Sequence, residues 1–246
     1  MLLLLRKVRR NLMQKNKITT YLLYALGEIV LVVIGILIAV NINNWNQSRI
    51  DRKKELSYLR SYASDLKVNI KELERVTIKS SRMSALADVL IQSFASSGKD
   101  IGLDETDSIL FELIGYTKYL SQEGTKENVL GAGSLEIIGD LHVRSSFVTH
   151  EADLKRMRAS EHYAFNVFEE YMDYLKGNIR MYNFQLGKSM LDSDIISSLS
   201  SDTYFLNLID DLSVIYRELN DHYKDRRNAL EMLLNTVEAE IEELAS

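Results

Sequence analysis

The sequence predicts an all-α fold: a single transmembrane helix that continues into a membrane-anchored, antiparallel helical bundle with long, coiled-coil-like helices. Three observations support this prediction. The 246 residues include no proline and only 11 glycines, so few positions break a helix. Residues 18–42 form one apolar segment. In the remainder, apolar residues recur at alternating spacings of three and four along two long stretches, which is the heptad pattern of packed helices.

The composition excludes several classes of function. The chain has no cysteine, which excludes a disulfide scaffold, a thiolate metal site and a cysteine nucleophile. The net charge of −5 is unevenly distributed, because residues 1–54 carry ten basic and two acidic residues, while residues 55–246 carry 20 basic and 33 acidic ones. An acidic body lacks the basic face that phosphate contacts require, so we expect no nucleic-acid partner.

Residues 18–45 are predicted to form the transmembrane helix. About 20 apolar residues span a bilayer, and this segment contains one charged residue, Glu28. Trp45 follows the apolar run, where an interfacial aromatic side chain anchors a helix end. A carboxylate inside a bilayer is costly and is usually functional. Glu28 is therefore a candidate functional residue if the span begins near residue 20, and a headgroup-level residue if it begins near Ile29.

Residues 1–17 are expected to form a basic amphipathic segment on the cytoplasmic face of the membrane, so the lipid bilayer is the first predicted partner. A positive flank without fixed structure is the alternative. The candidate membrane-surface residues are Arg6, Lys7, Arg9 and Arg10.

The distribution of cations predicts the orientation of this helix. Six Lys and Arg residues precede Ile18, and four follow the span between residues 49 and 54. The positive-inside rule therefore favours a cytoplasmic N-terminus and a C-terminal domain outside the cytoplasm. The apolar segment is longer than the core of a signal peptide, and no small-residue cleavage site follows it, so we expect an uncleaved signal anchor.

Two stretches resemble a known family. RKVRRNL and YALGEIVLVVIGILIAVNINNWN are similar to the N-terminal signature of an uncharacterised family of bacterial single-pass membrane proteins, known only as a domain of unknown function. VLGAGSLEIIGDLHVRSSF is similar to a second element of that family, although His150 and Glu151 replace its usual pair of aromatic residues. The resemblance implies a Gram-negative inner-membrane protein with a periplasmic body. It implies no activity, cofactor or catalytic residue.

Residues 46–246 are predicted to form one periplasmic helical bundle domain that begins and ends in heptad seams. We expect the two seams to pack on each other within one chain; a homo-oligomer that pairs the first seam with itself is the alternative. The membrane helix is expected to run on into the first seam, unless it breaks near Asn41–Asn46. The first seam comprises Leu56, Leu59, Ala63, Leu66, Ile70, Leu73 and Thr77; the second comprises Phe205, Ile209, Leu212, Tyr216, Leu219, Tyr223, Arg226, Leu230, Leu233 and Val237.

Shorter elements are expected between the seams. The pattern of apolar residues predicts a helix over Asp104–Leu120, and four glycines between residues 124 and 139 predict the main break in the body. Asp140 is the expected N-cap of a long helix that runs to about Tyr182. Residues 183–200 are expected to form a loop or brief helices, and Ser201 or Asp202 is expected to cap the last helix.

The sequence carries no recognisable catalytic set, so we expect no enzyme activity, no cofactor and no metal. His150 and Asp153 have an i, i+3 spacing that can bind metal, but ordinary surface histidines are the simpler interpretation for His142, His150, His162 and His222. GAGS at 131–134 lacks the lysine of a phosphate-binding loop.

Two functions from different classes remain. The leading hypothesis is a membrane-anchored periplasmic scaffold, or an accessory subunit of a membrane complex, with a membrane or periplasmic protein partner. The alternative is a sensor-like ligand-binding helical bundle that signals through a membrane partner.

Overall fold

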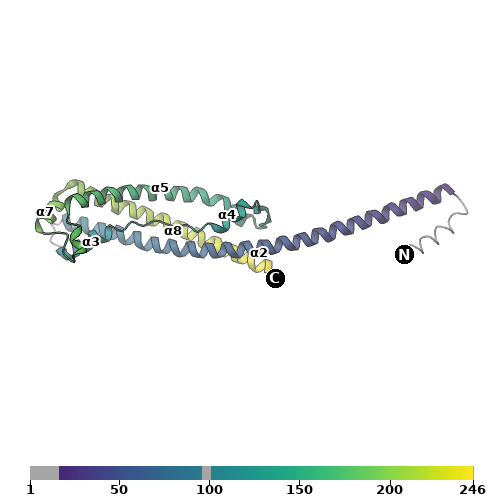
Figure 1. Ribbon diagram of the computed structural model, residues 1–246, viewed down its shortest axis with the longest axis horizontal. Helices are drawn as coiled ribbons and strands as arrows, with labels where there is room; N and C mark the ends of the chain where they lie inside the picture. Colours follow the sequence, from purple (N-terminus) through teal and green to yellow (C-terminus); the bar gives the residue numbers. More distant parts are fainter. Residues whose placement is uncertain (1–16, 96–100, 246) are drawn as a thin grey trace. The chain divides into compact units, whose positions relative to one another are not determined.

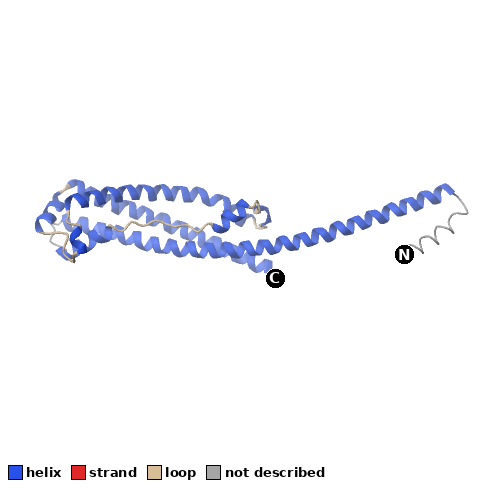
Figure 2. Ribbon diagram, in the orientation of Figure 1, coloured by secondary structure: helices blue, strands red, loops and turns tan. Residues whose placement is uncertain are grey.

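The computed structural model describes the backbone of residues 17–95 and 101–245, and their side chains apart from those of residues 17–20 and 150–152. Helices account for the regular structure throughout these residues, and the described residues contain no strand (Figure 2). The chain divides into two compact units, Met1–Lys54 and Glu55–Ser246. The elements are the α-helices α2 (Lys17–Ala95), α3 (Leu103–Leu113), α4 (Gly124–Gly131), α5 (Leu141–Asn178), α6 (Tyr182–Gln185), α7 (Ser193–Ser201) and α8 (Thr203–Ala245), and the 3₁₀ helix η1 (Leu135–Ile137).

Helix α2 contributes to both units. It is a single α-helix of 79 residues, so the alternative of a break near Asn41–Asn46 does not occur. No proline interrupts its hydrogen bonds. In the first unit, every side chain from Tyr21 to Ile50 is exposed. This part of the helix, although strongly apolar, is therefore covered by no other described part of the chain.

In the second unit, α2 buries a broad stripe. The first predicted seam is buried at its central positions, with Leu59, Leu66 and Leu73 at most 2% exposed. A second set, which the sequence analysis did not single out, is buried at every seventh residue alongside it. A stripe of this width contacts more than one neighbouring element. The second set comprises Glu55, Tyr62, Asn69, Val76, Met83 and Leu90.

Helices α5 and α8 pack against each other and accompany this part of α2 (Figure 1). Ser84 on α2 donates to the carbonyl of Ser213 on α8 at 3.0 Å, and the Asn220 amide on α8 donates to the carbonyl of Thr77 at 2.7 Å. Lys67 and Glu238 form an ion pair at 2.7 Å. Residue numbers along α2 thus fall as those along α8 rise.

The ends of the long helices are fixed by carboxylates. Asp140 accepts the N–H of Val143 at 2.7 Å, which confirms it as the N-cap of α5. Asp202 accepts the N–H groups of Tyr204 and Phe205 ahead of α8, so the second of the two expected caps is the one used. Helix α5 ends at Asn178, four residues before the predicted end. The Asn178 side chain there donates to the carbonyl of Tyr174 at 2.8 Å.

The predicted helix over Asp104–Leu120 is wrong in its second half. Helix α3 ends at Leu113, and residues 115–123 have no regular structure. This segment, which we call the strap, connects α3 at one end of the second unit to α4 at the other end (Figures 1 and 2). Buried side chains alternate along it at Thr117 and Tyr119, which is the period of an extended chain and not of a helix.

The buried stripe on α2 makes a direct prediction about stability. Leu73 is fully buried and Ile78, five residues further on the same helix, is 63% exposed. In the full-length protein in detergent, Leu73→Ala should lower the free energy of unfolding by about 2–5 kcal/mol, because it leaves a cavity. Ile78→Ala should change it by less than about 0.5 kcal/mol. Denaturation followed by circular dichroism measures both, and equal effects would contradict the assignment of the buried face.

Candidate functional site

The exposed apolar part of α2 contains the two membrane candidates named from the sequence. Glu28 is exposed and Trp45 is 67% exposed. They lie 17 residues apart on one helix, or roughly 25 Å along its axis, so the structure does not bring them together. The four candidate surface cations, Arg6, Lys7, Arg9 and Arg10, lie outside the described residues.

One helix in the described part of the chain is long and apolar enough to cross a membrane, judged by length and composition. Its exposed apolar side chains run from Tyr21 to Ile50. A soluble protein rarely leaves a continuous apolar surface of this extent uncovered. The finding is therefore compatible with a single-pass membrane protein.

The strap is the most unusual feature of the second unit, because side chains of other helices satisfy its backbone. Asn69 on α2 forms a pair of hydrogen bonds with Gln122: its amide nitrogen donates to the Gln122 carbonyl at 2.9 Å, and its amide oxygen accepts the Gln122 N–H at 2.7 Å. Asp65, one turn earlier, accepts the N–H of Thr125 at 2.9 Å. Lys79 and Arg75 donate to strap carbonyls at 3.4 and 3.5 Å.

Glu161 on α5 holds the strap from the other side. It is 6% exposed, and its Oε1 accepts the backbone N–H of Tyr119 at 2.7 Å and the hydroxyl of Tyr223 on α8 at 2.8 Å. The Tyr116 hydroxyl donates to the Glu161 carbonyl at 3.1 Å. One carboxylate thus links the strap, α5 and α8.

The tyrosines around Glu161 remain protonated. Burial raises the pKa of Tyr223, and the nearby Glu161 carboxylate raises it further. Burial also raises the pKa of Tyr119. A phenol with a raised pKa keeps its proton at any physiological pH, so the Tyr223 hydroxyl remains a hydrogen-bond donor to Glu161.

The polar members of the second heptad set on α2 have a common role. Glu55 accepts the N–H of Gly139, and the Tyr62 hydroxyl lies 3.1 Å from the Ser146 hydroxyl of α5. Asn69 binds the strap as described above. The three side chains therefore fasten three separate segments to one face of α2. Sequence reasoning missed them, although a polar residue at every seventh position of an apolar helix is a readable signal.

Glu161 was also missed. It follows Leu154 and Met157 and precedes Ala164, all of which are buried at helical spacing on α5. A carboxylate in the middle of an apolar stripe signals a buried charge that needs partners. The sequence does not show that those partners are a strap amide and a tyrosine 62 residues away.

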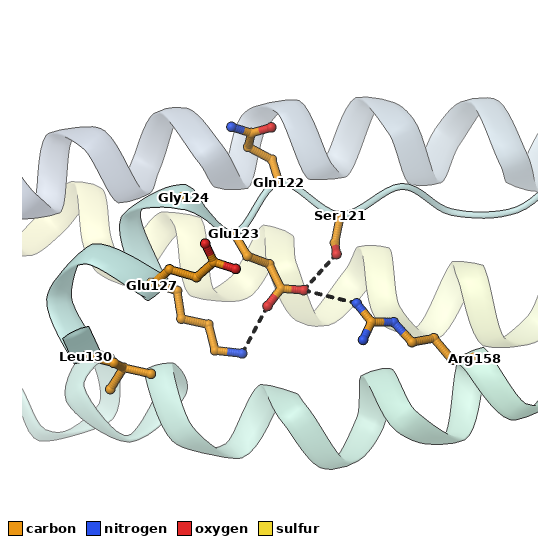
Figure 3. Close-up of a pocket in the computed structure, with 8 residues that line it drawn as sticks. Ser121, Gln122, Glu123, Gly124, Glu127, Leu130 and Arg158 are labelled. Carbon is orange, nitrogen blue, oxygen red and sulfur yellow. Dashed lines mark hydrogen bonds and ion pairs between the residues drawn. The ribbon is translucent and has the colours of Figure 1, made fainter.

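A polar depression of about 570 Å³ lies beside the strap (Figure 3). At its centre Glu123 accepts hydrogen bonds from Ser121 at 2.7 Å, Lys126 at 3.2 Å and Arg158 at 3.4 Å. Burial raises the pKa of Glu123, but the hydrogen bonds from Ser121 and Lys126 outweigh this, so its pKa lies below the ordinary value. The charges in the depression compensate one another. A smaller cavity of about 30 Å³ adjoins it, with room for about one water molecule.

The histidines give no metal site in the part of the chain that the structure describes, where no group of three or more metal-binding side chains occurs. His142 and His162 are exposed, and His222 lies 3.4 Å from Glu218. The side chain of His150 is outside the described set, and Asp153 pairs with Arg156 at 2.7 Å.

The GAGS segment ends a helix. Gly133 has a φ of +62°, its N–H donates to the carbonyl of Leu130, and the N–H of Ser134 donates to the carbonyl of Val129. This is the Schellman arrangement at the C-terminus of α4. The glycine is required because few other residues adopt a positive φ.

Comparison with known proteins gives one match. Residues 28–115 match the model of DUF6090, a family of unknown function. No curated protein and no solved structure matches the chain. The matched region includes Glu28, most of α2 and all of α3, and it ends at Gly115, where the strap begins. The similarity supports the expected relation to an uncharacterised family and assigns no chemistry.

The Glu161 network predicts a large loss of stability when its carboxylate is removed. Glu161→Ala leaves two buried donors unsatisfied, and each costs about 1–3 kcal/mol. We expect the free energy of unfolding to fall by about 2–5 kcal/mol. Glu161→Gln retains an acceptor oxygen and should lose less. Glu169→Ala, at an exposed position of α5, is the control and should change it by less than about 0.5 kcal/mol. Equal losses for all three variants would contradict the network.

The lowered pKa of Glu123 predicts that this residue makes an acid-sensitive contribution to the free energy of unfolding. Because the pKa is lower in the folded state, the contribution is present above the ordinary value of 4.5 and is lost as the pH falls through the folded-state value. The urea midpoint of the wild type should therefore fall more steeply below pH 4.5 than that of Glu123→Gln. Glu127→Gln, at an exposed position in the same depression, should follow the wild type. Parallel curves for the wild type and Glu123→Gln would refute this.

Proposed function

We propose that the protein is a non-enzymatic, membrane-anchored scaffold or accessory subunit of a membrane complex. In this proposal residues 18–45 cross the inner membrane of a Gram-negative bacterium once, with the N-terminus in the cytoplasm. Residues 46–246 form an antiparallel helical bundle in the periplasm.

One observation carries the proposal: the apolar side chains between Tyr21 and Ile50 are all exposed, on the same helix whose later residues are packed. Lipid is the environment that removes such a surface from water. The charge pattern supports the orientation, because the shorter flank carries six cations, and a large domain can be translocated with little regard to its own charge.

The use of polar side chains in the second unit supports a scaffold role. Asn69, Glu55 and Glu161 bind backbone groups of neighbouring segments, so these polar groups hold the body together and are not directed at a substrate. The first seam is buried within the chain, with Leu59 and Leu66 at most 2% exposed. This favours seam pairing inside one chain over a homo-oligomer formed through the same residues.

The polar depression of Figure 3 favours a second candidate, a sensor-like ligand-binding bundle that signals through a membrane partner. Its lining includes the charged residues Glu123, Lys126 and Arg158. It suits a small polar ligand whose charged groups replace the ion pairs that these residues form with one another. Native mass spectrometry of the full-length protein purified from membranes distinguishes the two candidates. A stoichiometric small molecule that is lost in Arg158→Ala supports the sensor, and its absence from the wild type supports the scaffold.

The topology gives the main test of the proposed function. A reporter enzyme that is active only outside the cytoplasm, fused after Ser246, should be active, and a reporter that is active only in the cytoplasm should be silent. Deletion of residues 21–42 should reverse both results and release the protein from the membrane fraction. Neutralising Arg6, Lys7, Arg9 and Arg10 should reduce the outside signal, since these cations favour the cytoplasmic side. A cytoplasmic signal from the intact chain would overturn both the orientation and the localisation.

A further inference from the structure

Four large apolar side chains are exposed on α3 and on the loop that contains α6, and we call them together the aromatic patch: Phe111, Tyr182, Phe184 and Leu186. The rings of Phe111 on α3 and Phe184 on α6 stack with centroids 3.8 Å apart. The four residues are 43%, 65%, 49% and 62% exposed, respectively. Helices α3 and α7 lie at the end of this unit opposite α4 (Figure 1), so the patch lies at the α3 end.

The loop that carries three of these residues is held in place. The N–H of Arg180 donates to the carbonyl of Met190 at 3.2 Å, which closes the loop at its base. Asp107 on α3 accepts the N–H of Met190 at 3.0 Å. Asn183 donates to the carbonyl of Ser189 at 2.8 Å across the interior of the loop.

The turn and the inner face of the loop add to this order. Gly187 has a φ of +63° at the tip, while Ile179, Met190 and Leu191 are buried on the inner side. The loop therefore packs on the molecule through these three buried residues. The exposed side chains of Tyr182, Phe184 and Leu186 are not needed for that packing. A pre-organised loop that displays aromatic side chains loses little entropy on binding, which is typical of an interaction surface.

The charges around the patch indicate the chemistry of its partner. Helix α3 has acidic residues in its first turn and no basic residue. Asp104 lies seven residues before Phe111, two turns away on the same face of α3. Arg180 pairs with Asp192 at 3.1 Å, and Glu112 pairs with Arg82. Helix α3, residues 179–192 and α7 carry six carboxylates: Asp104, Glu105, Asp107, Glu112, Asp192 and Asp194. Three cations accompany them: Arg180, Lys188 and the Arg82 that pairs with Glu112.

We propose that the aromatic patch is the docking surface for a second protein, whose contact site is an apolar pocket bordered by lysine and arginine. The inference rests on the proposed role as an accessory subunit and names the surface that this role would use. An acidic border attracts a basic one and repels its own kind. A second copy of this chain would present the same carboxylates, and anionic lipid headgroups would meet like charge, so neither matches the patch.

Site-specific photo-crosslinking in cells tests this inference. A photoreactive phenylalanine replaces Tyr182 in the full-length protein, and the same residue replaces Tyr163 on α5, a tyrosine that is 54% exposed, as the matched control. We expect an adduct with one other protein from position 182 and none from position 163. Mass spectrometry then identifies the partner for purification.

Binding of the purified partner to the full-length protein in nanodiscs of neutral lipid gives the quantitative test. Phe184→Ser should raise the dissociation constant tenfold or more, since aromatic anchors dominate interfaces. The double variant Asp104→Lys, Glu105→Lys should raise it about tenfold and should remove the salt dependence seen with the wild type. Circular dichroism and denaturation midpoints close to the wild-type values show that the variants are folded.

The other outcomes overturn the inference. These are an adduct between two copies of the chain, an adduct with lipid, an adduct that is no stronger than that from position 163, and binding that neither variant weakens. If position 163 alone captures a protein while the reporters place the body outside the cytoplasm, the proposed function stands and the patch is not its surface. If the reporter fusions place the body in the cytoplasm while position 182 captures a basic partner, the docking surface is supported and the proposed localisation is wrong.

Discussion

The structure depends on one helix meeting two different demands. From Tyr21 to Ile50 the side chains of α2 are exposed on all sides, and from Leu59 to Phe94 one broad face is buried. The first part is compatible with an apolar solvent such as the core of a bilayer, and the second packs against protein neighbours. The strap, α4, α5 and α8 supply those neighbours, because each is hydrogen-bonded to residues along that face.

The strap shows how a non-helical segment is accommodated in such a body. Its backbone N–H and C=O groups cannot bond within the segment, and burial without partners would cost free energy for each group. Asn69 supplies both a donor and an acceptor to Gln122, and Glu161 supplies an acceptor to Tyr119. The side chains of α2 and α5 thus replace the hydrogen bonds that a helix or a sheet would have provided. This also explains why polar residues occupy positions that the periodicity assigns to the core.

The absence of proline, the spacing of apolar residues and the capping residues predicted the long helices well and the strap poorly. The absence of proline and the spacing of Leu59, Leu66 and Leu73 were enough to predict a long packed helix, and a single carboxylate, Asp140, was enough to mark where α5 begins. The sequence did not reveal the strap because Leu110, Leu113 and Thr117 continue a helical spacing. In addition, the side chains that bind it lie 37 to 53 residues away in the chain. The aromatic patch was not predicted for a similar reason: the sequence shows that Phe111 and Phe184 are apolar, but not that they are exposed to solvent.

The contacts between α2 and α8 suggest why small and polar residues interrupt both seams. Ser84 meets Ser213, and Asn220 meets Thr77 and Ser80, all of them buried. The small side chains let the two helices approach, and each hydrogen bond is made in one register. A shift of one heptad would place Asn220 opposite Ile70 and Leu73 or opposite Ser84 and Ala87, and in both registers its amide would lose the Ser80 hydroxyl. The loss of a buried hydrogen bond disfavours those registers. An all-leucine seam would not supply this kind of uniqueness.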